Sequence, residues 1–290
     1  MRGAKQPIAA LAVTLLALSE ASAGPTIGQL EIKTLNSEPG EIEFQSQNAY
    51  AMGNPRRRTR VTPDGIEADD NTVTKQRHAL EIEVGITRYL KARVGIEYER
   101  ERLDEIDTLS EAKSFGKIEL DEYAAEAIVV FVPRAGDGWG LGMVIEYEHP
   151  ADSDSAKALN VGPILEVANG KWILSLNPIL TQVFGGERNA AGQRDEKIDF
   201  SYTARILHHW SDNIDLALEA YGTIERIGGR GGRSEAAQLF GDFDQHRLGP
   251  VAYWNYEVAD MEASLGLGVL FGLNSATSDV ALKTSLELTF

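Results

Sequence analysis

The feature that most constrains this chain is an alternation of apolar and polar residues, repeated in stretches of about ten residues. From Leu80, aliphatic side chains occupy every second position, and Glu81 and Glu83 lie between them. Successive side chains of a strand point to opposite faces of a sheet. This spacing therefore predicts β-strands that are apolar on one face and polar on the other.

The alternation recurs up to the last residue of the chain. Clear copies lie at 80–86, 90–98, 139–147, 159–167, 172–180, 198–206, 214–220, 261–271 and 280–290. Weaker candidates at 41–50, 117–132 and 243–256 bring the count to about twelve strands. Most are close to the roughly 9 to 11 residues that a tilted strand needs to cross the hydrocarbon layer of a membrane. We therefore predict an all-β fold, a transmembrane antiparallel up-and-down β-barrel of about twelve strands.

The connections between these stretches alternate in length. Short turns are expected at 88–89, 133–137, 168–171, 208–213 and 257–260. Longer polar loops are expected at 51–77, 101–116, 149–156, 185–195 and 227–242. Short turns at one end and long loops at the other are typical of outer-membrane barrels, whose short turns face the periplasm. An even number of strands puts both ends of the barrel sheet on that side.

Aromatic residues cluster near the predicted strand ends, where amphipathic rings lie at the depth of the lipid headgroups. The periplasmic ring is predicted to contain Tyr89, Phe131, Trp139, Trp172, Trp210, Tyr256 and Phe290. A half-buried strand of a soluble β protein explains any single stretch equally well. The joint pattern favours the membrane barrel, because closure leaves no unpaired strand edge in lipid.

The N-terminus has the three parts of a cleavable secretory signal. Arg2 and Lys5 precede an apolar run at 8–18, and the small residues Ala21 and Ala23 follow it. The run is far shorter than the roughly 20 residues of a membrane-spanning helix, so we predict cleavage after Ala23 rather than a membrane anchor. The expected domains are the signal peptide 1–23, a periplasmic N-terminal segment 24–40 and the outer-membrane barrel 41–290.

The composition excludes several classes of function. A net charge of −16 argues against a nucleic-acid partner, because phosphate binding needs a basic surface. The chain has no cysteine, which rules out disulfides and thiolate metal sites. No nucleotide-binding motif or energy-coupling domain is visible, so we expect passive transport with no cofactor, no metal and no enzymatic activity.

Charged residues fall on the polar face of the predicted strands. A charge on the lipid face costs up to about 2–4 kcal/mol at mid-depth, so these side chains are predicted to point into the lumen. The predicted lumen-lining residues are Glu81, Glu83, Lys91, Arg93, Glu97, Glu146, Glu166, Asp199, Arg205, Asp215, Glu219, Arg247, Glu262, Lys283 and Glu287.

Two interpretations of the charged lumen remain open. A water-filled path lined by acidic residues favours cations, whereas Glu–Arg and Glu–Lys pairs would close the interior as a structural plug. Barrels of about eight strands are filled and barrels of about sixteen hold an open channel, so about twelve strands lies between the two. We favour a narrow, charged pore for small solutes, with a closed barrel as the alternative.

The C-terminal stretch 282–290 resembles the terminal strand of outer-membrane barrels, which ends in phenylalanine and has apolar residues at alternate positions before it. The resemblance implies that Phe290 is the assembly signal recognised by the barrel assembly machinery. Together with the signal peptide, it implies a location in the outer membrane of a Gram-negative bacterium.

Two short segments carry a narrower likeness. Glu81–Leu90 and His246–Val251 resemble outer-membrane transporters associated with phenol-degradation pathways. The resemblance implies transport without naming a solute. Arg88 and Tyr89 depart from the acidic turn expected at that place.

Histidines near the predicted rim raise an alternative to transport. His78, His149 and His246 are expected at the outer ends of strands, with aspartates nearby in sequence. A histidine oriented by a carboxylate can act as a general base, so an outer-membrane hydrolase at the extracellular rim is one alternative. No serine–histidine spacing stands out and no compact ligand set is present, so no catalytic or metal-binding residue is assigned.

The first long loop contains a basic cluster, Arg56, Arg57 and Arg58 with Arg60. Guanidinium groups fit phosphates well, so this cluster could bind lipopolysaccharide, an expected partner together with outer-membrane lipid. Acidic residues follow closely, which equally fits a solvated loop. A structural or adhesive barrel acting through its loops is therefore the other alternative.

Overall fold

The protein is built almost entirely of long β-strands. The computed structural model describes residues 30–57, 59–63, 65–68, 73–103, 106–153, 155–185, 196–229, 244–258 and 261–290. Within these ranges, one closed antiparallel barrel of twelve strands is formed. Its strands are β1 (Ile42–Met52), β4 (Thr74–Thr87), β5 (Leu90–Glu101), β6 (Glu119–Val132), β7 (Gly138–Pro150), β8 (Ala156–Asn169), β9 (Trp172–Gly185), β10 (Lys197–Ser211), β11 (Ile214–Gly229), β12 (Gln245–Val258), β13 (Met261–Gly272) and β14 (Val280–Thr289). Among the described residues, no helix is both long enough and apolar enough to span a membrane.

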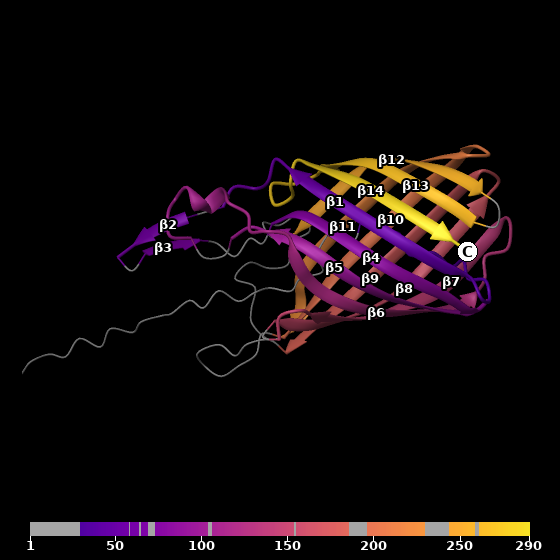
Figure 1. The fold of residues 1–290 in the computed structure, drawn as a ribbon, viewed down its shortest axis with the longest axis horizontal. Coiled ribbons are helices and arrows are strands. Elements are labelled where there is room, and N and C mark those ends of the chain that lie inside the picture. The colour runs from indigo at the N-terminus through magenta and orange to yellow at the C-terminus, as the bar shows by residue number, and fades with distance from the viewer. Residues whose placement is uncertain are drawn as a thin grey trace, which may run out of the picture.

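The barrel closes where its first strand meets its last. β1 pairs with β14 from Glu43 opposite Thr289 to Met52 opposite Val280, and its other edge pairs with β4. The remaining barrel strands pair in chain order, which is an up-and-down connection (Figure 1). The predicted fold class is confirmed, and the three weaker candidates correspond to β1, β6 and β12.

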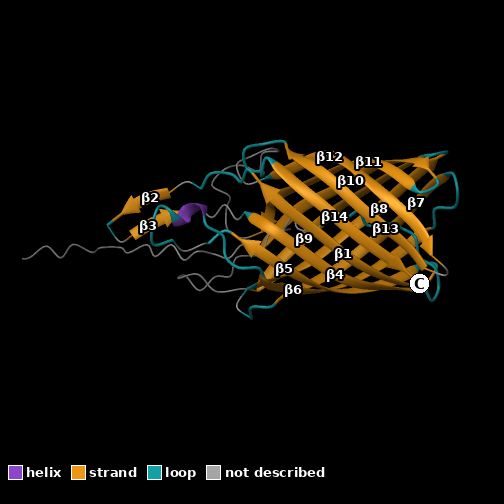
Figure 2. Ribbon diagram, turned by 45° about the horizontal axis from the view of Figure 1, so that its top comes forward, coloured by secondary structure: helices purple, strands orange, loops and turns teal. Residues whose placement is uncertain are grey.

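The two ends of the barrel differ in the size of their connections. At the end that carries the C-terminus, tight turns such as the one at Arg88 and Tyr89 join the strands. At the other end, the connection between β1 and β4 holds a separate hairpin of β2 (Thr59–Thr62) and β3 (Gly65–Ala68), which extends beyond the barrel in Figures 1 and 2. The connection between β5 and β6 contains a short 3-10 helix at Glu111–Lys113. The end with the tight turns is therefore the periplasmic one.

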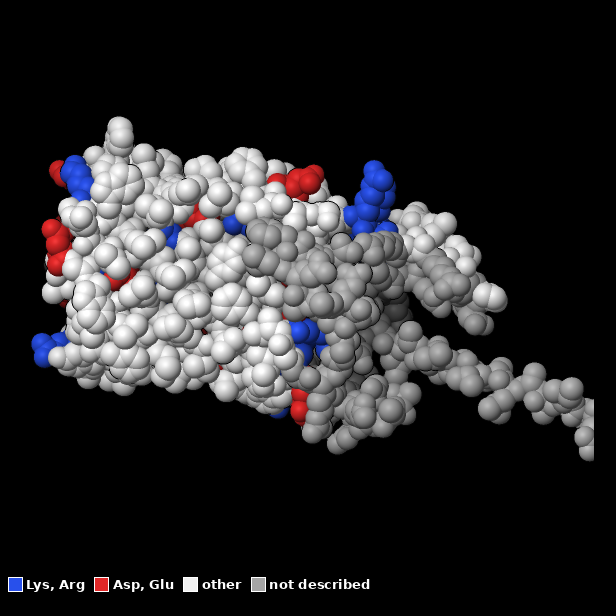
Figure 3. Space-filling view, turned by 180° about the vertical axis from the view of Figure 1, so that it is seen from behind, with Lys and Arg blue, Asp and Glu red and all other residues white. Residues whose placement is uncertain are grey.

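The outer wall of the barrel is apolar. Val94 is 61% exposed and Leu180 is 50% exposed at mid-strand positions, where a soluble protein would place polar side chains. The space-filling view shows one side of the outer wall. Charged atoms lie mainly near the two ends of the barrel on that side, with only small patches of charge between them (Figure 3). The predicted periplasmic aromatics are all exposed, each between 42% and 64%: Tyr89, Phe131, Trp139, Trp172, Trp210, Tyr256 and Phe290.

A closed barrel with this outer wall is a transmembrane barrel. Closure pairs the main-chain groups of every wall strand with neighbouring strands, which removes the cost of unpaired polar groups in lipid. The exposed aliphatic side chains face the acyl chains, and the belt of periplasmic aromatic residues lies at the level of the lipid headgroups. Charged side chains on the same strands have only the lumen left to occupy.

Candidate functional site

Alternate positions of the strands carry charged side chains into the lumen. Twelve of the predicted lumen-lining residues are buried: Glu81, Glu83, Lys91, Arg93, Glu97, Glu146, Glu166, Asp199, Asp215, Glu219, Arg247 and Lys283. Of the others, Arg205 and Glu287 are half-buried, and Glu262 is exposed near the periplasmic mouth. The inner wall is thus charged where the outer wall of the same strands is apolar.

A stretch of the N-terminal segment runs inside this lumen. Residues 30–35, which we call the inner segment, are largely buried among the wall side chains, with Leu30 2% and Lys33 3% exposed. The sequence predicted a periplasmic location for the whole of 24–40, and for these residues the prediction is corrected. The physical reason is the width of a twelve-stranded wall, which its own side chains do not fill.

The chain enters the lumen at the periplasmic rim. Gly40 N donates a hydrogen bond to Gly85 O (2.7 Å), and Gly85 N donates to Glu41 O (2.9 Å). These bonds attach the chain to the end of β4 just before β1 begins. Burial, with the carboxylates of Glu43 and Glu38 nearby, raises the pKa of Glu41 above its ordinary value.

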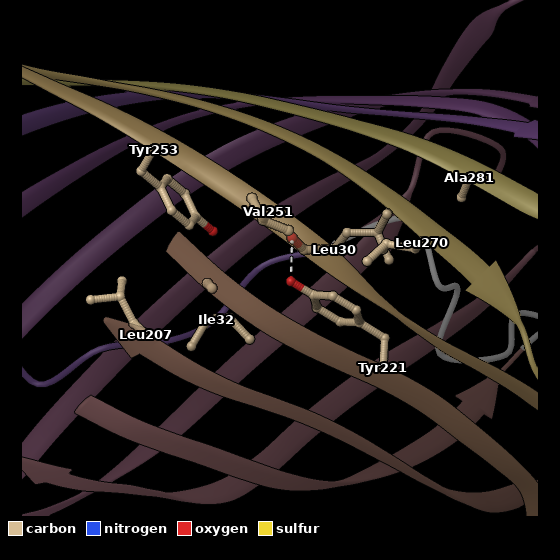
Figure 4. Close-up of a cluster of buried hydrophobic side chains, with 9 residues drawn as sticks. Leu30, Ile32, Leu207, Tyr221, Val251, Tyr253, Leu270 and Ala281 are labelled. Atoms are coloured by element: carbon tan, nitrogen blue, oxygen red, sulfur yellow. Dashed lines mark hydrogen bonds between the residues drawn. The ribbon is translucent and has the colours of Figure 1, made fainter. Parts of the chain in front are cut away.

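The inner segment packs on two apolar clusters of the inner wall. Figure 4 shows Leu30 beside Leu270 and Val251, and Ile32 near Leu207. The first cluster joins these two segment residues to Leu207, Ala217, Tyr221, Val251, Tyr253, Leu270 and Ala281. The second joins Leu35 to Ile128, Val130, Val144 and Ile164. The segment therefore contacts β6 to β8 as well as β10 to β14.

Arg93 joins the inner segment to the wall by ion pairs. Its guanidinium lies 2.5 Å from Glu31 and 2.8 Å from Glu83. Lys33 Nζ lies 2.7 Å from Glu31 and 2.5 Å from Glu126. Buried charges are stable only with such partners, so these residues form one connected network of both signs.

A second cation, Arg77 on β4, pairs with carboxylates from two neighbouring strands, β5 and β6. It forms an ion pair with Glu97, and its guanidinium nitrogens lie 2.9 Å from Glu122 and 3.7 Å from Glu99. One positive charge here faces three negative ones. This part of the wall, from β4 to β6, is therefore acidic overall.

A separate network lies on the wall formed by β10 to β14. Lys283 Nζ lies 2.8 Å from Glu219, and the Tyr221 hydroxyl donates to the same carboxylate at 2.5 Å. The Tyr253 hydroxyl donates to Glu219 as well. The Arg205 guanidinium lies over the Tyr253 ring, 5.8 Å from its centroid. Two cations are thus gathered around one carboxylate on this side.

Between the inner segment and the wall lies a cavity of about 60 Å³. Three carboxylates and two cations line it, namely Glu31, Glu146, Glu148, Lys33 and Arg77. Polar groups make up much of the remaining lining, among them Asn160, Ser201, Thr203, Tyr221 and Thr223. A buried water needs about 10–15 Å³ and several polar partners, so this cavity can hold a few water molecules.

The rim histidines are not brought together. His78, His149 and His246 lie on β4, β7 and β12, which are not neighbours in the barrel. His149 stacks on Tyr147, and the His246 ring contacts the Tyr202 hydroxyl at 2.9 Å. Within the part of the chain that the structure describes, no group of histidine and acidic residues is suited to hold a metal ion.

Sequence reasoning missed the side chains that hold the inner segment. Asn177 is fully buried on β9, where its side-chain amide bonds the main chain of Lys33. Tyr221 and Arg77 also lie on lumen-facing positions of their strands. The prediction selected charged residues and so passed over the amide of Asn177 and the hydroxyl of Tyr221. Arg77 was missed because 51–77 was predicted to be a loop, whereas β4 begins at Thr74.

Comparison with known proteins extends the description of the fold. No known family matches the chain, and no curated protein matches its sequence. The COG4313 outer membrane channel from Pseudomonas putida F1 is similar in structure over 88% of this chain and 96% of that one, with a TM-score of 0.57 and 11% identity. The NanC porin is similar over 85% of this chain and 98% of that one, with a TM-score of 0.51 and 8% identity.

At these identities the likeness shows a shared fold and nothing finer. The fold is that of bacterial outer-membrane barrels. With its apolar outer wall and its belt of aromatic residues, the chain is an outer-membrane protein of the porin-like architecture.

Proposed function

We propose that the protein is a passive outer-membrane channel for small hydrophilic solutes, with an acidic lumen that favours cations. The observation that carries the proposal is the position of the inner segment. Small barrels of about eight strands are filled by their own side chains. A barrel whose cross-section admits a polypeptide chain encloses a passage wide enough for small solutes.

The charge around the cavity supports a preference for cations. Glu146 and Glu148 line it, and the Asn160 amide donates to them at 3.1 Å and 2.6 Å. The two cations of the lining are already shared, since Arg77 faces three carboxylates and Lys33 lies within 3.9 Å of three, Glu31, Glu126 and Glu146. Fixed negative charge along a pore raises the local concentration of cations and lowers that of anions.

The likeness to transporters of phenol-degradation pathways suggests small aromatic molecules as an alternative solute class. The charged cavity favours ionic solutes instead, because an uncharged ring would displace water from carboxylates without replacing its hydrogen bonds. We therefore expect that phenol does not reduce the cation current of the channel.

We also propose lipopolysaccharide, outer-membrane lipid and the barrel assembly machinery as partners. Phe290 is 61% exposed at the end of the last strand, which suits recognition by another protein. In the basic loop, Arg57 donates to the carbonyl of Leu103, whereas the side chain of Arg56 is exposed. Arg56 is thus placed to contact a phosphate of the surface lipid.

Conductance across a planar bilayer tests the channel proposal. The mature protein, refolded and inserted, should conduct in potassium chloride, and its reversal potential in a salt gradient should indicate cation preference. Exchanging Glu146 and Glu148 for glutamine should reduce that preference. Glu257→Gln, an exposed change at the periplasmic rim, is the matched control and should leave it unchanged. A folded protein that never conducts contradicts the channel, and an unchanged reversal potential in the double variant contradicts the acidic selectivity.

A further inference from the structure

We propose that the inner segment is a displaceable plug that regulates passage through the lumen. This inference rests on the proposed channel function and adds its regulation. Residues 30–35 occupy the lumen without being part of the wall, whose strands begin at Ile42. Removing them leaves every strand pairing of the barrel in place.

The main chain of the segment is held by side chains rather than by a strand ladder. Lys33 N donates to the Asn177 amide oxygen at 2.9 Å, and the Asn177 amide nitrogen donates to Lys33 O at 3.1 Å. The Tyr221 hydroxyl, whose shorter hydrogen bond goes to Glu219, also lies 3.1 Å from Leu30 O. Among the described residues, no main-chain hydrogen bond joins residues 30–37 to the wall. A few side-chain contacts are easier to release together than a cooperative ladder.

Most charges of the wall keep a partner when the segment leaves. Glu146 gives up Lys33, 3.9 Å away, and keeps the hydrogen bond that the Asn160 amide donates to it. Arg93 gives up Glu31 but retains Glu83 at 2.8 Å and Glu81 at 3.4 Å. Glu126 gives up Lys33 and retains Arg93 at 3.6 Å. Water that enters the vacated lumen hydrates the remaining groups. The segment also contains an ion pair of its own, because Lys33 Nζ lies 2.7 Å from Glu31. These two charges can remain paired with each other when the segment leaves the lumen.

The part of the inner wall that holds the segment has a specific shape. Leu35 points at two glycines of β7, and a Cβ at Gly140 or Gly142 would lie 2.7 Å or 2.6 Å from its methyl carbons. A Cβ there would also crowd the wall itself, Arg134 N at 3.0 Å from Gly140 and Val129 O at 2.8 Å from Gly142, so the glycines leave a recess that Leu35 fills. A recess shaped for one side chain indicates a defined docked position rather than loose filling of space.

A hinge at the periplasmic rim allows the segment to swing without detaching. Ser37 Oγ donates to Thr87 O at 2.7 Å, and the bonds of Gly40 and Glu41 to Gly85 hold the next residues. Gly40 has a φ of +89°, a conformation that residues with a side chain rarely adopt. Residues 38–41 therefore fix the base of the plug, and its free movement is toward the periplasm.

Asn177→Ala in the full mature chain is the first test. It removes both bonds to Lys33 and should raise the fraction of time that the channel is open several-fold, because the docked state loses its main-chain bonds at Lys33. Gln47→Ala is the matched control, since Gln47 is also a buried amide, its side chain donates to the wall residue Gln45 at 3.1 Å, and it is not among the residues that line the cavity. It should leave the open fraction unchanged.

A shortened chain that begins at Glu38 is the second test, and it keeps the rim bonds of Gly40 and Glu41 to Gly85 and the whole wall, while losing the Ser37 bond. It should be open continuously and with a larger conductance than the full chain. A synthetic peptide of residues 24–37, added to the periplasmic side, should block its current, and the same peptide with Ile32→Asp should block far less.

The outcomes separate this inference from the channel proposal. Folding of each variant is checked by the heat-dependent migration of the barrel on a gel. If the full and shortened chains conduct equally and the peptide has no effect, the plug is wrong and the channel stands. If no folded variant conducts, including the shortened one, both the channel proposal and the plug proposal are wrong.

Discussion

At the scale of single residues, Arg93 pairs with more buried carboxylates than any other side chain that the structure describes. Glu31, Glu81, Glu83 and Glu126 all lie within 3.6 Å of its guanidinium. The planar fork of arginine can contact several carboxylates at once, which the single ammonium of lysine does less well. Breaking such a buried group by removing one partner is costly, because the others remain as uncompensated charge.

Arg93→Gln should therefore lower the free energy of unfolding by about 3–5 kcal/mol. Urea unfolding of the barrel in lipid vesicles, followed by tryptophan fluorescence, measures the change. Arg88→Gln is the control, because Arg88 is exposed in a periplasmic turn and only lies over the Tyr89 ring, 4.6 Å from its centroid. It should cost less than about 1 kcal/mol. Equal losses in the two variants would show that the network does not support the barrel.

At the scale of elements, the strands could be predicted because their signal is local. For β4 and β5, the alternation of apolar and polar residues within the strand itself indicates which side chains face lipid and which face the lumen. No knowledge of the rest of the chain is needed. The inner segment depends instead on distant partners. Lys33 meets Asn177, 144 positions away in sequence, and Tyr221 reaches Leu30 across 191 positions. The local hint was the presence of apolar residues in a segment that was predicted to lie in the periplasm.

The seam between β1 and β14 is the element on which closure depends. Phe290 N donates to Ile42 O at 2.9 Å, and Ile42 N donates to Phe290 O at 3.2 Å. Both bonds use the main chain, whereas the phenyl group is exposed. The side chain of Phe290 is therefore free for recognition, and the seam does not need it.

Phe290→Ala should separate assembly from stability. Because both main-chain bonds persist, the free energy of unfolding of the assembled barrel should change by less than about 1 kcal/mol. The amount of folded, heat-modifiable barrel in the outer membrane of cells should fall several-fold, because the assembly signal is lost. A large loss of stability with normal assembly would indicate that the phenyl group serves the seam and not recognition.

At the scale of the whole molecule, two separations of polarity organise the barrel. The first, apolar outside and charged inside, is encoded in each strand and was predictable. The second is between the two sides of the lumen. The side of Arg77 and Arg93 holds more carboxylates than cations, whereas around Glu219 the cations Lys283 and Arg205 are in excess. The two sides are formed by contiguous strands, β4 to β6 and β10 to β14, but which charges pair across neighbouring strands does not follow from the alternation alone.

The orientation of the molecule decides from which side the plug works, and the absence of cysteine makes it testable. Ser110 lies exposed in the connection between β5 and β6, beyond the mouth that we place outside the cell, and Lys171 lies exposed in a tight turn at the opposite end. Intact cells that carry Ser110→Cys should react with a membrane-impermeant maleimide. Cells that carry Lys171→Cys should react only after the outer membrane is permeabilised. Both changes are in solvent, so neither should alter the amount of folded barrel. The reverse labelling pattern would put the short turns and the hinge at residues 38–41 on the cell surface, and the plug would then open outward.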